Sequence, residues 1–380
     1  MYDVVLLGAT GFTGALTAEH LARHVPAGAR WALAGRSAPK LAAVAARLGV
    51  TGLDLIPADV SDPASLRRLA SSTRVLVSTV GPYLTHGMPV VAACAEAGTD
   101  YLDLTGEPEF VDRVYVEQHA RAVASGARLV HSCGFDSVPY DLGAFFTVSQ
   151  LPSDVPIRLE GYVTASAGFS GGTLHSAVNA LGRLRASAAV ARERRALEGR
   201  GTRVVRGASR PPHYDHRLGV WALPAPTIDP LVVLRSARAS AEYGPDFRYG
   251  HHIGVKGLAT AVGLAVGAGA VVGLAQLPVT RKWLLGLKEA GDGPSAEQRA
   301  RSWFKVVFFA TAGDERLVTE VAGGDPGYGD TAKMLAESAL CLAFDTLAPT
   351  AGQVTPAIAM GSPLITRLAA AGITFTTRHL

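Results

Sequence analysis

Apolar and polar positions follow two periods along the first 140 residues. Short runs rich in Val, Leu and Ile have the length of strands, and amphipathic helical patterns lie between them. The runs are YDVVLLGA, RWALAGR, LDLIPAD, RVLVSTVG, DYLDLTG and ARLVHSCG. Nearly continuous apolar runs are typical of strands that are covered on both faces, as in parallel sheets. The pattern therefore predicts an α/β fold built on a doubly wound parallel sheet of six strands.

Two of the helical segments carry start signals. SAPKLAAVAARLG and SDPASLRRLASS each begin with a Ser that is followed by a Pro two residues later. A Ser side chain can cap the first free N–H groups of a helix, and Pro is favoured in the first turn because it has no N–H to satisfy. We therefore predict Ser37 and Ser61 as N-caps, with Pro39 and Pro63 in the first turns.

The first predicted strand runs into GATGFTG, which spaces its glycines as GxxGxxG. Glycine lets the backbone approach a pyrophosphate, and the start of the next helix offers free N–H groups and the positive end of the helix dipole. Because the motif follows a strand and opens a helix, it predicts a Rossmann-type dinucleotide-binding domain over residues 1–140; a tight turn without a ligand is the alternative. The cofactor contacts predicted here are Gly8, Thr10, Gly11, Phe12, Thr13 and Gly14.

The end of the second strand indicates which dinucleotide binds. NAD sites place a carboxylate there for the ribose hydroxyls, whereas this chain has Arg36, Ser37 and, further on, Lys40. A guanidinium matches a 2′-phosphate, so these residues predict NADP(H); a solvated Arg36 is the alternative. Asp59 ends the third strand, where it either contacts the adenine or caps a helix.

The carboxyl ends of the later strands should line the same crevice as this turn. The fourth strand ends with Ser78, Thr79, Val80 and Gly81, which we expect along the ribose and nicotinamide. Tyr83 follows at once and is placed to reach the reacting atoms. DLTGE and HSCGFDSVP end on the same edge, so we predict a functional loop there.

These strings together resemble a known family. GATGFTG, VSTVGPYLTHGMPVVAACAEAGTDYLDLTGE, HSCGFDSVPYDLG, GGDPGYGDTAKM and AMGSPLITRLAAAGITF are similar to saccharopine dehydrogenase-like oxidoreductases, and the nearest subgroup is the trans-acting enoyl reductases of bacterial lipid and polyketide assembly. The resemblance implies an NADPH-dependent reductase that saturates an enoyl thioester with a long acyl or polyketide chain. It also implies a second, α+β substrate domain over 141–330 and C-terminal helices over 331–380 that pack back on the Rossmann domain.

Reduction of an enoyl thioester needs a donor for the enolate oxygen and a source of a proton for the α-carbon. The predicted catalytic residues are Tyr83, Asp136 and Ser137, with Tyr140 nearby. Tyr83 is the first choice as donor, whereas Asp136 could instead organise its loop and Ser137 could cap the following helix. Cys133 is more typical of a small buried residue than of a nucleophile.

A segment from Gly257 to Thr280 holds no charged residue and lies between Lys256 and Arg281. A single membrane span would separate the two ends of a fold that should pack together, and Gly and Ala dilute its hydrophobicity. Three interpretations stay open: a buried helix that lines an apolar substrate channel, a helix that dips into one leaflet, or a homodimer contact through GxxxG pairs. Two other functions also stay open: a saccharopine-type oxidoreductase acting at carbon–nitrogen bonds, and a non-catalytic lipid- or membrane-surface protein.

Charge and composition limit the classes of partner that this chain is expected to bind. A net charge of +4 and a pI of 9.0 in 380 residues, with no basic tail, do not indicate nucleic-acid binding. Arginines dominate residues 183–210, which form either a solvated helix or a docking face for an acidic acyl carrier protein or a CoA phosphate. GGDPGYGDTAKM either lines the cleft, binds an anion or forms an interdomain turn.

The remaining residues predict no metal and a reducing compartment. His251 and His252 are adjacent, so in a strand they point to opposite faces and cannot share a metal ion. The three cysteines are far apart and form no CxxC pair. With no signal-peptide pattern at the start, we expect a cytoplasmic protein, with contact to the inner face of the plasma membrane if the apolar segment meets lipid.

Overall fold

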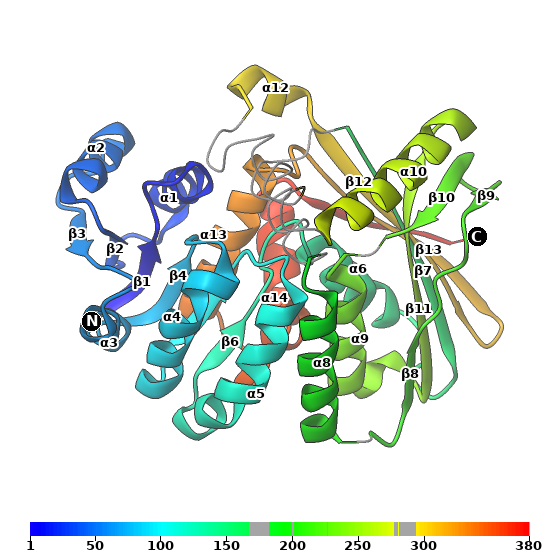
Figure 1. The fold of residues 1–380 in the computed structure, drawn as a ribbon, viewed down its shortest axis with the longest axis horizontal. Helices are drawn as coiled ribbons and strands as arrows, with labels where there is room; N and C mark the ends of the chain where they lie inside the picture. Colours follow the sequence, from blue (N-terminus) through cyan, green and yellow to red (C-terminus); the bar gives the residue numbers. More distant parts are fainter. Residues whose placement is uncertain (167–181, 200, 226, 277–279, 281–293, 380) are drawn as a thin grey trace.

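The computed structural model describes residues 1–166, 182–199, 201–225, 227–276, 280 and 294–379. Two sheets, one parallel and one mixed, lie side by side with helices between them and around the first (Figure 1). The predicted fold class, a Rossmann-type parallel sheet with a second α+β domain, is confirmed.

Sheet A is parallel and has the order β14-β6-β5-β4-β1-β2-β3. The six predicted strands are β1 (Tyr2–Leu7), β2 (Trp31–Gly35), β3 (Asp54–Pro57), β4 (Thr73–Ser78), β5 (Asp100–Asp103) and β6 (Arg128–Val130). The central strands β1, β4 and β5 are buried over most of their length, as the apolar runs predict. A seventh strand, β14 (Gly352–Val354), pairs with β6. All six strands predicted within residues 1–140 are present, and β14 comes from outside that range, where a strand of three residues leaves no periodic pattern to detect.

The helices that cover sheet A are α1 (Phe12–His24), α2 (Ala38–Leu48), α3 (Pro63–Ser71), α4 (Tyr83–Ala97) and α5 (Pro108–Ser125). Ser37 caps α2 through a bond from the Lys40 N–H, as predicted. The predicted Ser61 cap of α3 is wrong, because the neighbouring Asp62 accepts the Ala64 N–H. The Ser61 hydroxyl instead donates to Asp59.

Sheet B is mixed and has the order β15-β13-β12-β7-β11-β10-β9, with β8 beside β11. Its strands are β7 (Ile157–Ser166), β8 (Val204–Gly207), β9 (His213–Asp215), β10 (Val220–Pro224), β11 (Asp246–Val255), β12 (Trp303–Ala312), β13 (Glu315–Gly323) and β15 (Thr374–His379). Three helices pack on its inner face: α6 (Val138–Val148), α9 (Asp229–Ala239) and α14 (Pro356–Ala370) (Figure 1). Short helices η1 (Ala241–Tyr243) and α12 (Ala296–Arg301) lie in its connections, and α8 (Leu184–Glu198) packs on α5.

The C-terminal segment joins the two sheets. The buried helix α13 (Gly329–Phe344) packs on α1 and β4, and α14 packs on α6. The strands that follow these helices differ in destination: β14 extends sheet A, whereas β15 pairs with β13 in sheet B. The last part of the chain therefore links the two sheets directly.

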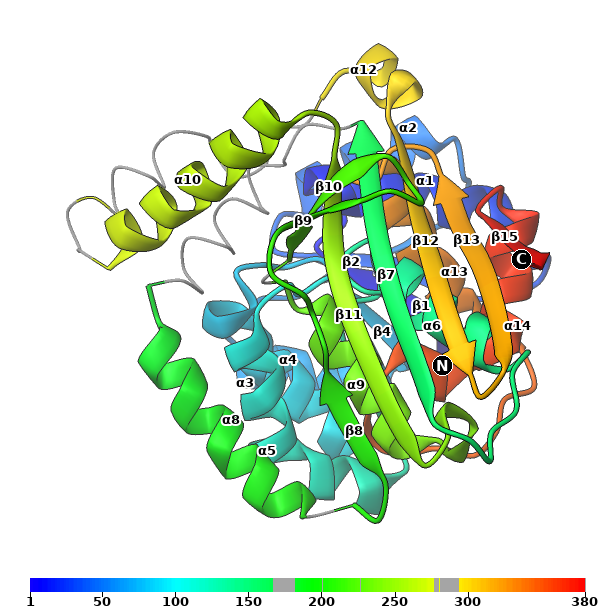
Figure 2. The same ribbon diagram turned by 90° about the vertical axis from the view of Figure 1, so that its right-hand side faces the viewer.

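Helix α10 (Leu258–Ala275) forms most of the predicted apolar segment, of which residues 277–279 lie outside the described residues. Figure 2 shows it standing away from sheet B, and most of its residues are exposed. The interpretation of this segment as a buried helix is therefore wrong. Nothing in its own composition distinguishes a helix buried in protein from one that is exposed to another apolar medium.

Candidate active site

The turn between β1 and α1 is built for close approach of its backbone to other groups. Gly8 has φ of +93°, and a Cβ there would lie 2.7 Å from the Thr79 Oγ1. A Cβ on Gly14 would lie 2.2 Å from the Gly8 carbonyl oxygen. The Thr79 hydroxyl lies 3.2 Å from the Leu7 carbonyl oxygen and 3.1 Å from that of Gly8, so the end of β4 supports the turn.

Helix α1 begins at Phe12 with no side chain capping its N-terminus. Thr10 and Gly11 are exposed, and Phe12 and Thr13 are partly exposed. Free N–H groups, the positive helix end and a backbone that no Cβ obstructs fit the pyrophosphate of a dinucleotide. The turn lies at the switch point of sheet A, where β1 has β2 on one side and β4 on the other.

Substitution of Gly14 by alanine should destabilise the fold by about 1–3 kcal/mol, because the new Cβ overlaps the Gly8 carbonyl oxygen. Gly11→Ala is the matched control, since its Cβ would lie 3.5 Å from the same oxygen. Urea unfolding of both variants without cofactor measures the difference. Equal free energies of unfolding would contradict the close approach.

Arg36, Ser37 and Lys40 lie where β2 runs into α2. Arg36 and Lys40 are exposed, and the Ser37 hydroxyl accepts the Lys40 N–H at 3.5 Å. The exposed Arg36 guanidinium at the carboxyl end of β2 fits a 2′-phosphate. Asp59 follows β3 and accepts the N–H and hydroxyl of Ser61, which lowers the pKa of its carboxyl; it does not cap a helix.

The loop after β4 carries Ser78, Thr79, Val80 and Gly81 to the same edge. Ser78 is buried, Thr79 and Val80 are partly buried, and Gly81 is exposed. The Tyr83 ring is buried against Phe110, and its hydroxyl donates to the Ser78 carbonyl oxygen at 3.1 Å and accepts the Leu104 N–H at 3.2 Å. Burial and the nearby Asp103 carboxylate raise the pKa of Tyr83 well above its usual range. In this conformation the hydroxyl holds the loops after β4 and β5 together.

Glu107 is a residue that the sequence analysis missed. Its buried carboxylate accepts the N–H groups of Tyr83 at 3.1 Å and Leu84 at 2.8 Å, at the first turn of α4. It therefore fixes the chain next to the predicted nicotinamide side of the crevice. Glu107 lies in the DLTGE motif, but nothing in the sequence shows which helix a loop carboxylate caps.

Asp136 and Ser137 follow β6 on the same edge. Asp136 is partly buried, and its Oδ1 lies 3.7 Å from where a Gly106 Cβ would stand. Burial and the carboxylate of Asp103 raise the pKa of Asp136 to about 6. The predicted Ser137 cap is wrong in part: Ser137 occupies the N-cap position of α6, but its hydroxyl lies 2.5 Å from the Asp136 carbonyl oxygen and 3.5 Å from Asp229 Oδ1.

A second carboxyl, Asp229, was not anticipated from the sequence. It is buried at the start of α9, and the Thr227 hydroxyl donates to it at 2.5 Å. Burial raises its pKa well above the usual range, and the Asp136 charge acts in the same direction. Carboxyls whose pKa values are raised by burial are typical of acid–base sites. Sequence could not place them together, because the two residues lie on different domains.

Aromatic and imidazole groups surround Asp229. His251 Nε2 lies 3.6 Å from Asp229 Oδ2, and its Nδ1 lies 2.8 Å from the Tyr249 hydroxyl. Burial lowers the pKa of His251 to about 3, so this imidazole is neutral at physiological pH. The Tyr140 ring packs edge-on against His251. His252 stacks on Tyr162 instead, so the two histidines have separate partners.

Asp103 and His131 form a buried pair behind the crevice edge. His131 Nδ1 lies 2.7 Å from Asp103 Oδ2, while Asp103 Oδ1 accepts the N–H groups of Thr105 and Ser132 at 3.0 Å each. Ser132 has a left-handed backbone, with φ of +59°. The pair therefore holds the loops after β5 and β6 in place beside Asp136. Cys133 is fully buried with a raised thiol pKa, which confirms its assignment as a small buried residue.

The GGDPGYGDTAKM segment forms the turn from β13 to α13. Asp325 accepts the N–H groups of Gly327, Tyr328 and Gly329, and Asp330 accepts that of Gly324. The turn's own carboxylates occupy the helix N-terminus, so the structure supports a connecting turn and not an anion site. The Tyr328 ring packs edge-on against Phe12 at 4.7 Å, which ties this turn to the cofactor motif.

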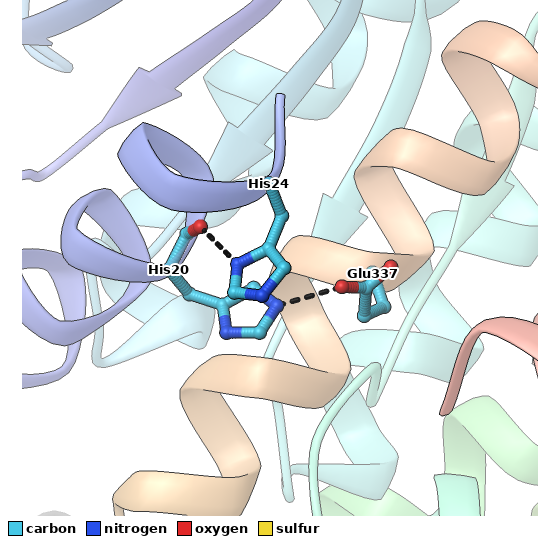
Figure 3. A group of neighbouring side chains, drawn as sticks. All are labelled: His20, His24 and Glu337. Carbon is cyan, nitrogen blue, oxygen red and sulfur yellow. Dashed lines mark hydrogen bonds and ion pairs between the residues drawn. The ribbon is translucent and has the colours of Figure 1, made fainter. Parts of the chain in front are cut away.

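His20, His24 and Glu337 place three metal-binding atoms within 4.8 Å of one another (Figure 3). The two histidines are four residues apart on α1, a spacing that the sequence analysis overlooked. Each already has a direct partner: His20 Nε2 lies 2.7 Å from Glu337, and His24 Nδ1 lies 2.8 Å from the His20 carbonyl oxygen. Glu337 also pairs with Arg367. These bonds link α1, α13 and α14 and explain why the three side chains lie together. The absence of a metal stays a prediction.

Most of the arginine-rich segment has partners that its own sequence does not reveal. Arg183 bonds Glu109 through two nitrogens at 2.7 Å each, and Arg194 is buried between Asp112 and Glu198. Arg203 bonds backbone carbonyl oxygens near η1. Arg194 is therefore not available to a docking face; Arg185, Arg192 and Arg195 on α8 are exposed, whereas Arg200 lies outside the described residues.

The glycine turn at the switch point of sheet A and the exposed Arg36 are features of a Rossmann-type, NADP-dependent oxidoreductase. Residues 4–130 match the saccharopine dehydrogenase NADP-binding domain. The whole chain is 35% identical to a trans-acting enoyl reductase of Mycobacterium bovis (strain BCG / Pasteur 1173P2) and covers 98% of it. A protein of Mycobacterium tuberculosis (strain ATCC 25618 / H37Rv) is named as a candidate trans-acting enoyl reductase. It is 38% identical to this chain, which covers 98% of it. The chain belongs to the trans-acting enoyl reductase family of saccharopine dehydrogenase-like proteins.

A solved structure shows the same fold. Saccharopine dehydrogenase (L-Glu forming) from Saccharomyces cerevisiae aligns over 99% of both chains with a TM-score of 0.56 and 13% identity. At that identity the likeness shows the architecture of the two sheets and nothing about the substrate.

Proposed function

We propose that this protein reduces the carbon–carbon double bond of a 2-enoyl thioester with a long apolar acyl or polyketide chain, using NADPH. The observation that supports this reaction is the full-length similarity to enoyl reductases. When bound, NADPH supplies the hydride for the β-carbon. Gly8, Gly11 and Gly14 would hold its pyrophosphate, and Arg36 its 2′-phosphate.

The proton for the α-carbon would come from Asp136. A carboxyl with a pKa of about 6 is protonated in about a tenth of the molecules at pH 7 and in the majority below pH 6, and Asp136 is partly exposed. Ser137 and Asp229 lie beside it and would keep its loop in place. Tyr83 can reach a substrate only if its hydroxyl leaves the Ser78 carbonyl oxygen, so we assign it to positioning the loop.

The experiment that tests this function is oxidation of NADPH with a long-chain 2-enoyl thioester, with the product identified by mass. A gain of two hydrogens at the double bond is expected, and the saturated thioester is the matched control. Turnover only with an imine or secondary amine of an amino acid would favour the saccharopine-type reaction. NADPH binding without turnover of either substrate would favour the non-catalytic alternative.

Charge reversal on the exposed face of α8 tests whether an acyl carrier protein docks there. Arg192→Glu/Arg195→Glu should raise the Michaelis constant for carrier-bound substrate by about tenfold and leave that for a short synthetic thioester unchanged, because exposed charges steer only a charged partner. Arg67→Glu/Arg68→Glu on α3 is the matched control, since both arginines are exposed on a helix that packs on α4 and β4, whereas α8 packs on α5. Equal effects of the two double variants would exclude α8 as the docking face.

A further inference from the structure

Helix α10 presents an apolar surface in more than one direction. It has 18 residues, none of them charged, and Thr260 is its one polar side chain. Leu258, Val262 and Val266 are 54%, 52% and 67% exposed, and Leu264 is 42% exposed. At about 100° of rotation per residue, Leu264 and Val266 point about 160° apart, on nearly opposite sides of the helix. The exposed valines and leucines therefore do not form a single stripe that one neighbouring element could cover.

The part of the chain that the structure describes leaves this helix largely uncovered. Only 12% of α10 is buried, and a Cβ built on Gly263, Gly267, Gly269 or Gly273 would meet no atom within 4 Å. A helix that is apolar on all sides is stable in water only when something else surrounds it, either a large protein core or the hydrocarbon of a membrane. By length and composition α10 is apolar enough for a membrane, with a mean hydropathy of 2.0.

We propose that α10 inserts into one leaflet of a phospholipid membrane and anchors the protein there. Lipid tails surround a helix on all sides, whereas a protein partner with a flat face would leave either Leu264 or Val266 in water. The charges next to the segment suit an anionic membrane surface: Lys256 is exposed just before α10, and Arg281, Lys282 and Lys288 follow in the sequence.

The topology of sheet B determines how deeply α10 can insert into the membrane. β11 precedes α10 and β12 follows it, and both strands pair with β7 in the same sheet. The chain must therefore leave and return on the same side of the membrane. Residues 281–292 carry several charges in the sequence, which makes them a poor second crossing. α10 thus lies in the near leaflet and does not span the bilayer.

The inference does not depend on the reaction that we propose, because it rests on the surface of α10, the charges beside it and the topology of sheet B. If both hold, the anchor brings the crevice to the surface of a membrane in which long apolar substrates dissolve. Binding to lipid and turnover of an enoyl thioester can be measured separately, so that either can fail without the other.

The test is co-sedimentation of the full-length protein with vesicles of phosphatidylcholine and phosphatidylglycerol, at low and high salt. The wild type should bind at both salt concentrations, whereas Leu264→Glu/Val266→Glu should bind about 100-fold more weakly, because charged side chains enter hydrocarbon poorly. Both residues are exposed, so the variant should keep its thermal midpoint and its NADPH affinity. Leu197→Glu, 60% exposed at the far end of α8, is the matched control and should bind as the wild type does.

A fluorescent label that reports polarity separates insertion from adsorption. The native cysteines are buried, so a label on Val266→Cys should shift to the blue with vesicles, and a label on Leu197→Cys should not. A wild type that stays in solution with every vesicle, or a Leu264→Glu/Val266→Glu variant that binds like the wild type, would overturn the proposal. A lipid-free dimer that this variant dissociates, without vesicle binding, would overturn it in favour of a second copy.

Discussion

Substitution of Arg36 by alanine is expected to raise the Michaelis constant for NADPH by about 10- to 100-fold and to leave that for NADH unchanged. Arg36 is exposed at the carboxyl end of β2, and among the described residues its guanidinium interacts electrostatically with the Asp59 carboxylate. A charged, two-nitrogen bond to a 2′-phosphate contributes about 1.5–3 kcal/mol, which corresponds to that range. Steady-state kinetics with both coenzymes measures the change.

Arg47→Ala is the matched control for this experiment. Arg47 is exposed in the last turn of the same helix, α2, and lies away from the carboxyl end of β2. It should leave both Michaelis constants unchanged. An Arg36→Ala variant that loses NADPH and NADH affinity equally would indicate that Arg36 supports the turn and does not read the 2′-phosphate. An unchanged preference would mean that the guanidinium is only solvated.

The parts of the fold that sequence predicts are those encoded by neighbouring residues. Apolar runs locate the strands of sheet A because burial on both faces removes polar positions from each strand. The Ser37 cap is found because the signal spans four residues. β14 and β15 cannot be predicted in this way. β14 pairs with β6 and β15 pairs with β13, and both pairings join residues that are more than fifty positions apart in the sequence. The same holds for α10, whose apolar sequence suits protein core and lipid equally.

The candidate site divides in the same way. Gly8 and Gly14 are recognisable from spacing, because the turn that needs them lies within one short segment. Asp229 is not recognisable: it approaches Ser137 across the two domains, and its raised pKa results from burial that no local pattern records. For Arg194 the local sequence misleads in the opposite direction. The basic segment predicts an exposed arginine, but Arg194 is buried against Asp112 of α5, a helix that is distant in the sequence. Local motifs thus predict where the cofactor binds, whereas the acid–base groups depend on tertiary packing.

Substitution of Asp136 by asparagine is expected to lower kcat for the enoyl thioester by about 100- to 10,000-fold, the usual contribution of a positioned proton donor. The dissociation constant for NADPH should stay near that of the wild type, because the cofactor residues lie on other loops. The substitution should not lower the free energy of unfolding. Since the folded-state pKa of Asp136 is raised to about 6, its charged form costs stability as the pH rises through that value. The variant should therefore be as stable as the wild type, or more so, above about pH 6.

The pH profile distinguishes a proton donor from a group that only positions the loop. A donor must be protonated, so kcat/KM of the wild type should be constant below about pH 6 and fall by about tenfold per pH unit above it. Asp136→Asn should lack this limb, whereas Asp62→Asn, which alters only the exposed cap of α3, should keep both the rate and the profile. If Asp136→Asn slows the reaction but retains the limb near pH 6, Asp136 positions its loop and the proton comes from another group.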